Sequence, residues 1–128
     1  MVDPLELAQR TARGHLDQEA CTWLSEGFAR WLAGDDLAHS LDLGTFTRLR
    51  SRNRALRAAA NLLDPDGAPW HQAGLLAAAI RRFETRIQPL IRRDPNHQVG
   101  PADACLQRAF ASGHRIPRTQ RALFDLLA

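Results

Sequence analysis

The chain contains no lysine, only two cysteines and no long apolar run. Every one of its seventeen basic residues is therefore an arginine. Two explanations account for this bias. One is selection for the forked guanidinium, which binds phosphate or carboxylate through paired hydrogen bonds. The other is the arginine codon usage of a GC-rich genome, which shifts composition without any function.

The sequence also lacks the motifs that mark catalytic and metal sites. Cys21 and Cys105 form no CxxC pair and no Cys/His cluster with zinc spacing. Each lies on the apolar side of a helical pattern, so we expect two buried, reduced thiols. GxSxG, HExxH, glycine-rich phosphate loops and paired carboxylates in apolar settings are all absent, and the five histidines are dispersed. The sequence predicts a protein that is not an enzyme and uses no cofactor or metal.

No apolar stretch approaches the roughly 18 residues of a membrane span. The first ten residues, MVDPLELAQR, carry acids where a signal peptide would carry positive charge. We therefore expect a cytoplasmic protein with no membrane partner.

The length of 128 residues, with 45% hydrophobic and 24% charged residues, predicts one globular domain covering residues 1–128. No stretch alternates with period two, whereas apolar residues recur at three- and four-residue steps. The fold class is therefore all-α, a single compact bundle of five or six helices. The helical patterns cover residues 4–14, 17–34, 45–63, 69–89, 101–112 and 117–127, with a brief turn at 36–41.

The segment 69–89 is the most apolar, and from Trp70 to Ile80 it is apolar on nearly every side. A helix of this kind is typical of a bundle centre. Pro89 is expected to end or kink it, because proline has no amide hydrogen. The predicted core residues are Trp23, Phe28, Trp31, Leu56, Leu76, Ile80 and Phe83.

The segment 45–63 has both an apolar seam and the densest positive charge of the chain. Thr45 or Thr47 is expected to cap its start, and Asp64 followed by proline to end it. The seam consists of Leu49, Asn53, Leu56, Ala60 and Leu63. Because a polar side chain in a seam must be satisfied, we expect Asn53 to make structural hydrogen bonds.

Five arginines lie on the two flanks of this seam, and the segment contains no acid. Arg50, Arg54 and Arg57 share one flank, and Arg48 and Arg52 share the other. Guanidinium groups at this density match phosphate oxygens, so these five residues are candidates for binding nucleic acid or a protein partner. The alternative is a solvated helix face whose aliphatic stems cover the edge of the core.

Charge is divided unevenly along the chain. Residues 1–44 contain three arginines against eight acids, whereas residues 45–128 contain fourteen arginines against six acids. The basic part indicates nucleic acid, an acidic membrane surface or an acidic protein as partner, and of these nucleic acid and an acidic protein are retained. Alternatively, the acidic third pairs with the basic remainder and the two fields cancel.

The last two helical patterns resemble a helix-turn-helix in outline. In that arrangement Arg118 and Arg121, with Thr119 and Gln120, would face the edges of bases. The connection HRIP is long and contains proline, which favours a plain helical hairpin.

Two functions are therefore expected. The first is a small helical protein that contacts nucleic acid through arginines 48–57. The second is a protein-protein interaction module, such as an adaptor or an inhibitor encoded by a mobile genetic element. The patterns indicate no oligomeric state.

Overall fold

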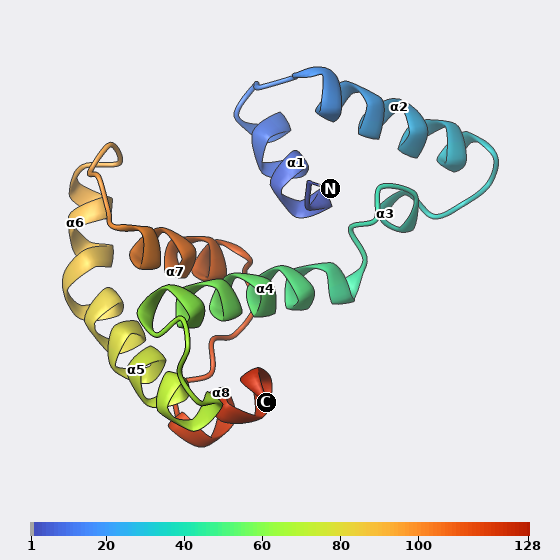
Figure 1. The fold of residues 1–128 in the computed structure, drawn as a ribbon. Helices are drawn as coiled ribbons and strands as arrows, with labels where there is room; N and C mark the ends of the chain where they lie inside the picture. Colours follow the sequence, from blue (N-terminus) through green and yellow to red (C-terminus); the bar gives the residue numbers. More distant parts are fainter. Residues whose placement is uncertain (1) are drawn as a thin grey trace. The chain divides into compact units, whose positions relative to one another are not determined.

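The computed structural model describes residues 2–128, with the exception of the Thr45 side chain. Within this part the chain is helical and contains no strand, which confirms the all-α prediction (Figure 1). The helices are α1 Pro4–Ala12, α2 Gln18–Leu32, α3 Leu37–Ser40, α4 Thr45–Leu63, α5 Pro69–Arg82, η1 Phe83–Ile87, α6 Gln88–Arg93, α7 Pro101–Ala111 and α8 Gln120–Leu127.

The segments α5, η1 and α6 follow one another without a break, so the described residues contain seven separate helices. The prediction of five or six is close, because α3 is a single turn of four residues. The contacts divide the chain into two compact units. The N-terminal unit ends at Ser51 and the C-terminal unit begins at Arg52, inside α4. A single cooperative domain over residues 1–128 stays a prediction.

The N-terminal unit has a small core. Its helices start where aspartates accept backbone hydrogen bonds, as at Asp3 and Asp17. Helix α2 ends at Leu32, and Gly34 follows two residues later with a φ of 113°, which suits a residue without a Cβ. Helix α2 packs against α1 on one side and against α3 on another. The buried residues of this unit are Leu7, Ala20, Gly27, Ser40, Leu41 and Thr47.

The aromatic residues of α2 lie outside this core, which corrects the sequence-based prediction. Phe28 is 43% exposed and Trp31 is 46% exposed. Trp23 is half-buried, and its indole N–H donates to the carbonyl of Leu41 at 2.9 Å. Helical periodicity correctly gathered these residues on one side of α2. It could not show that Ser40 and Leu41, at the end of α3, pack closely against Gly27 while Phe28 and Trp31 stay exposed.

The C-terminal unit has a larger aliphatic core, to which α4, α5, α7 and α8 all contribute. The predicted core residues Leu56, Leu76, Ile80 and Phe83 are fully buried. The ring of Phe83 stacks on Phe110 with centroids 5.2 Å apart. These four predictions are confirmed.

Helix α5 is amphipathic, so its predicted position at a bundle centre is wrong. Gln72, Leu76 and Ile80 are buried, and α5 packs against α8. Trp70 and Leu75 are 50% and 37% exposed. The side-on contact between the rings of Trp70 and Phe124 leaves half of the indole in solvent.

Pro89 does not end the long helix, because a π turn precedes it. The amide of Gln88 donates to the carbonyl of Phe83, five residues back, and α6 then continues through Pro89 to Arg93. A π turn is one of the known ways in which a helix absorbs an interruption of its hydrogen-bond ladder. The helix therefore continues four residues beyond the proline.

Three helix boundaries bear on the sequence predictions. Helix α4 ends at Leu63, directly before Asp64, as predicted. Thr47 donates its hydroxyl to the carbonyl of Asp42 at 2.7 Å, and the side chain of Thr45 lies outside the described residues. Helix α8 begins three residues later than predicted, at Gln120, because Thr119 is its N-cap and accepts from the amide of Ala122.

Candidate functional site

The two units carry opposite charge. The N-terminal unit has five arginines against eight acids, a formal charge of −3. The C-terminal unit has twelve arginines against six acids, a formal charge of +6. A candidate surface for a polyanion therefore belongs to the C-terminal unit.

In the N-terminal unit, the predicted site residues are Arg48 and Arg50, both exposed. A guanidinium nitrogen of Arg50 lies 3.7 Å from a carboxylate oxygen of Asp42 and 3.4 Å from the hydroxyl of Thr47. This acid belongs to the acidic first third of the sequence. Arg50 thus pairs locally with that third, as the alternative interpretation of the basic helix expected.

Arg52 is a structural residue of the C-terminal unit. Its guanidinium donates to Oδ1 of Asn53 at 2.9 and 2.6 Å, and to the carbonyl of Arg115 at 2.6 Å. Another contact of 3.3 Å reaches Nδ1 of His114. Partial burial lowers the pKa of Arg52, since desolvation disfavours its charged form. Arg52 thereby ties α4 to the connection between α7 and α8, and Asn53 makes hydrogen bonds as predicted.

Arg54 and Arg57 are both exposed on α4. Arg57 donates to the carbonyl of Leu126 in α8 at 3.2 Å. An arginine that hydrogen-bonds a carbonyl keeps its positive charge, but part of its donor capacity is already used.

The predicted base-reading arginines are paired with acids. Arg118 donates to both carboxylate oxygens of Glu84, at 2.9 and 2.8 Å. This paired hydrogen bond lowers the pKa of Glu84 and raises the pKa of Arg118. Arg121 lies 3.4 Å from Asp125 and over the ring of Phe124. With α7 and α8 separated by residues 112–119, the tight turn of a helix-turn-helix is missing.

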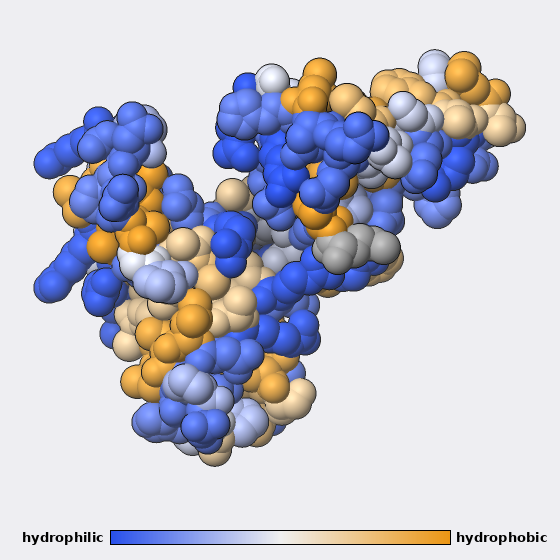
Figure 2. All heavy atoms as spheres, turned by 45° about the horizontal axis from the view of Figure 1, so that its top comes forward, coloured by the Kyte–Doolittle hydropathy of each residue, from blue (hydrophilic) through white to orange (hydrophobic). Residues whose placement is uncertain are grey.

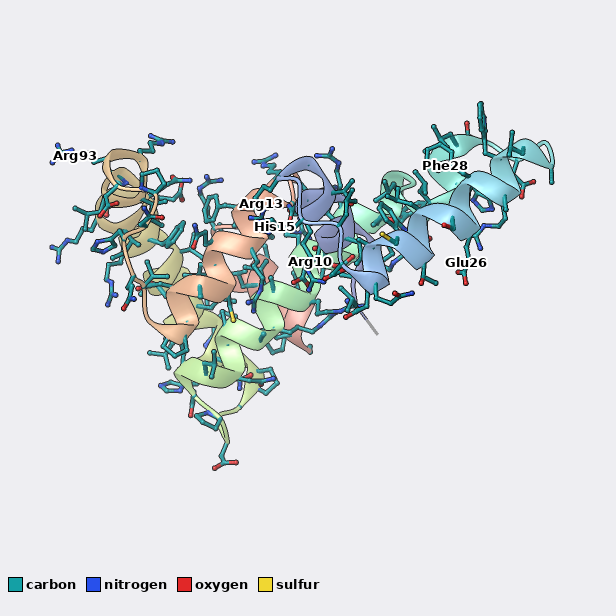
Figure 3. All side chains as sticks on the ribbon, turned by 90° about the horizontal axis from the view of Figure 1, so that it is seen from above. Arg10, Arg13, His15, Glu26, Phe28 and Arg93 are labelled. Carbon is teal, nitrogen blue, oxygen red and sulfur yellow. The ribbon has the colours of Figure 1, made fainter. Side chains whose placement is uncertain are left out.

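A second group of arginines, which was not among the predicted site residues, lies on the continuous helix α5–η1–α6. Arg81, Arg86, Arg92 and Arg93 are all exposed. Among the described residues no acid lies within ion-pair distance of these four side chains, whereas neighbouring Arg82 contacts Asp103 at 3.0 Å. Figure 3 shows Arg93 at the outer end of this helix. We call Arg81, Arg86, Arg92 and Arg93 the unpaired arginines.

A shallow pocket of about 310 Å³ lies beside the π turn. Ala77 and Ile80 supply apolar surface, and Arg81, Glu84, Thr85 and Arg118 supply polar groups. Because Glu84 neutralises Arg118, Arg81 is the cation of this pocket that has no acid partner. The pocket can therefore hold part of an anion beside Arg81.

The unpaired arginines had a signal in the sequence: between residues 81 and 93 there are five arginines and one acid. The distant pairing of that acid, Glu84, with Arg118 has no local signature. Within the part of the chain that is described, no group of three or more His, Cys, Asp or Glu side chains is arranged to hold a metal.

Among the same residues, no helix has the length and apolar character required to cross a membrane. The chain matches no protein-family model, and searches of curated proteins and of solved structures found no match either.

Proposed function

We propose that this chain is a small, non-enzymatic helical protein that binds the phosphates of nucleic acid through the unpaired arginines. The observation that carries the proposal is the exposure of these four guanidinium groups without an acid partner, in a unit with a formal charge of +6. Arginines of this kind do not lose an existing ion pair when they bind phosphate, so no broken ion pair offsets the free energy of binding.

The spacing of these arginines suits a chain of phosphates. Arg81 and Arg93 are twelve positions apart on a continuous helix, which corresponds to roughly 18 Å of helix length. Each phosphate that an arginine neutralises releases condensed counterions, and this release drives binding without regard to base sequence. By comparison, Arg50, Arg52 and Arg57 on α4 already have partners within the protein.

The experiment replaces the four unpaired arginines by glutamine and measures affinity for a short DNA duplex at several salt concentrations. Four phosphate contacts predict a slope of log affinity against log salt of about −3 to −4 for the unchanged protein. The quadruple variant should bind weakly, with a nearly flat slope. A matched control replaces Arg118 and Arg121, which pair with acids, and should keep most of the slope.

A further variant replaces Arg50, Arg54 and Arg57 on α4, the flank selected from the sequence. If this variant loses the slope and the quadruple variant keeps it, the contacts belong to α4. If protein free of carried-over nucleic acid shows no salt-dependent binding to DNA or RNA at micromolar concentration, the proposal is wrong.

A second candidate function is protein-protein interaction, and a different observation favours it. In the N-terminal unit large apolar side chains lie at the surface: Phe28, Trp31, Leu32 and Leu37 are between 37% and 78% exposed. Clustered apolar residues at the surface are typical of interaction sites.

A further inference from the structure

The pocket beside the π turn is a separate binding feature of the C-terminal unit. Its lining residues come from α5, from η1 and from Arg118, which precedes α8. Its volume of about 310 Å³ is at the lower end of the range for ligand sites, which is roughly 300 to 1,000 Å³. A small group can therefore enter this pocket, whereas a DNA duplex cannot.

One wall of the pocket is a fixed ion pair. Nε and a terminal nitrogen of Arg118 donate to the two carboxylate oxygens of Glu84, at 2.9 and 2.8 Å. The other terminal nitrogen of Arg118 donates to the carbonyl of Ile116 at 3.2 Å. Two parallel hydrogen bonds keep the guanidinium and the carboxylate near one plane, and the third bond holds the guanidinium in place. Guanidinium planes are surfaces on which nucleobases stack, so this wall suits a flat ring.

The other groups of the pocket are apolar surface, one hydroxyl and one cation. Ala77 and the small exposed part of Ile80 supply the apolar surface. Thr85 donates its hydroxyl to the carbonyl of Arg81 at 2.9 Å, which leaves the hydroxyl oxygen as an acceptor. Among the described residues no acid lies within ion-pair distance of the Arg81 guanidinium. A ligand that matches these groups has a flat ring with a hydrogen-bond donor and carries a phosphate, as a nucleotide does.

The arginines beyond the pocket indicate that this nucleotide belongs to a strand. Arg86, Arg92 and Arg93 follow Arg81 along the continuous helix, and all three are exposed. Figure 2 shows that the surface around α6 is largely hydrophilic. A free nucleotide is too short to contact both Arg81 and Arg93, which are separated by roughly 18 Å of helix. A single strand supplies a phosphate at every nucleotide, and its unpaired bases are free to stack.

We propose that the pocket binds one unpaired nucleotide of a single-stranded nucleic acid. The base stacks on the plane of Arg118 and Glu84, its phosphate binds Arg81, and neighbouring phosphates contact the other unpaired arginines. The inference rests on the proposed function and adds to it a preference for single strands over duplexes. The bases of a duplex are paired and stacked inside the double helix, so the pocket contributes nothing to duplex binding unless a base is flipped out.

The test compares the affinities of a short oligothymidylate and of a DNA duplex of the same length at one salt concentration, with protein free of carried-over nucleic acid. Phosphate contacts alone favour the duplex, because the salt dependence per phosphate is about 0.9 for a duplex and about 0.7 for a single strand. Stacking of one base should reverse this order, so that the single strand binds about 5-fold more tightly or better. Equal affinities, or tighter binding of the duplex, would overturn the proposal.

Two pairs of variants place the preference in the pocket. Arg118→Lys keeps the positive charge but removes the flat, forked pair, so the preference for the single strand should disappear while duplex affinity is unchanged. Arg121→Lys is its matched control, because Arg121 pairs with Asp125 outside the pocket. Ala77→Leu fills the pocket without changing an arginine and should also abolish the preference. Ala78→Leu, at an exposed position of the same helix, is its control and should keep the preference.

Competition with thymidine monophosphate distinguishes a strand from a free nucleotide. The monophosphate should displace the oligothymidylate only at concentrations about 100-fold higher or more, because it lacks the additional phosphate contacts. Displacement at equal concentrations would show that the ligand is a free nucleotide and would overturn the proposal. Urea denaturation checks that each variant is folded. If Ala77→Leu is destabilised, the comparison of Arg118→Lys with Arg121→Lys decides the result.

Failure of this inference and failure of the proposed function give different results. If duplex binding keeps its salt slope but the single strand is not preferred, the unpaired arginines bind phosphates and the pocket takes no base. If neither nucleic acid shows salt-dependent binding, both proposals are wrong. Variants Arg118→Lys and Ala77→Leu that keep the full preference would place the base outside the pocket and overturn the inference.

Discussion

The two units of this chain differ in how many of their large side chains they bury. In the C-terminal unit, Phe83 and three large aliphatic residues of α4 and α5 are fully buried, although Leu62, Trp70, Leu75 and Leu90 are exposed. In the N-terminal unit the buried side chains are few and mostly small, while Phe28 and Trp31 are exposed. Apolar burial is the main favourable contribution to folding. The C-terminal unit therefore buries more apolar surface in its own core than the N-terminal unit does.

The largest expected difference between the units is in thiol reactivity. Cys21 is exposed and Cys105 is buried, so the prediction of two buried thiols is wrong for Cys21. In dilute protein, Cys21 should react at the rate of a free thiol. Cys105 requires opening of the C-terminal unit, so its rate should be lower by about 1,000-fold or more. Alkylation followed by mass spectrometry measures both rates in one sample, and equal rates would show that the two environments do not differ.

The second test concerns the core of the C-terminal unit. Ile80→Ala should lower the free energy of unfolding by about 2 to 5 kcal/mol, because it leaves a cavity at a residue that is 1% exposed. Leu75→Ala, on the same helix but 37% exposed, is the control and should cost less than about 1 kcal/mol. Urea denaturation gives both values. One transition for the whole chain would support a single domain, and two transitions would support separately folding units.

The third test concerns the core of the N-terminal unit. Gly27→Ala places a methyl group against Leu41 and 3.3 Å from the carbonyl of Ser40. Overpacking costs about 1 to 3 kcal/mol, and the better helix propensity of alanine returns up to about 1 kcal/mol. Hydrogen exchange should therefore accelerate in α2 and α3 and stay unchanged in α5 and α7. Slower exchange in α2 would mean that Leu41 moves aside at no cost.

The smallest expected effect is the pH dependence of the ion pair in the C-terminal unit. Arg118 lowers the pKa of Glu84 in the folded state. The pair therefore contributes stability above the carboxyl's unfolded pKa, and this contribution is lost as pH falls through the lower folded pKa. The free energy of unfolding of the Glu84→Gln variant should depend less on pH in this acidic range than that of the unchanged protein. Parallel slopes of stability against pH would show that Glu84 has no influence on folding.

The sequence predicted the helices well because helical periodicity, proline and capping aspartates are local signals. It placed Leu56 and Ile80 correctly for the same reason. It was wrong about Phe28 and Trp31, because periodicity shows which residues share a side but not whether a neighbour covers that side. Arg52 was selected as a candidate binding residue. Its structural hydrogen bond to the carbonyl of Arg115 could not be foreseen, because it joins residues 63 positions apart. Contacts at that separation leave no pattern in one sequence.

The π turn before Pro89 has a consequence for where the unpaired arginines point. On a regular α-helix, residues eleven positions apart, such as Arg81 and Arg92, lie within about 20° of each other. The extra residue of a π turn changes this angle by about 100°. The π turn thus changes the angle about the helix axis between the arginines of α5 and those of α6. By this geometry the four side chains do not form one straight row along the helix, so the phosphate contacts proposed above would follow a curved path.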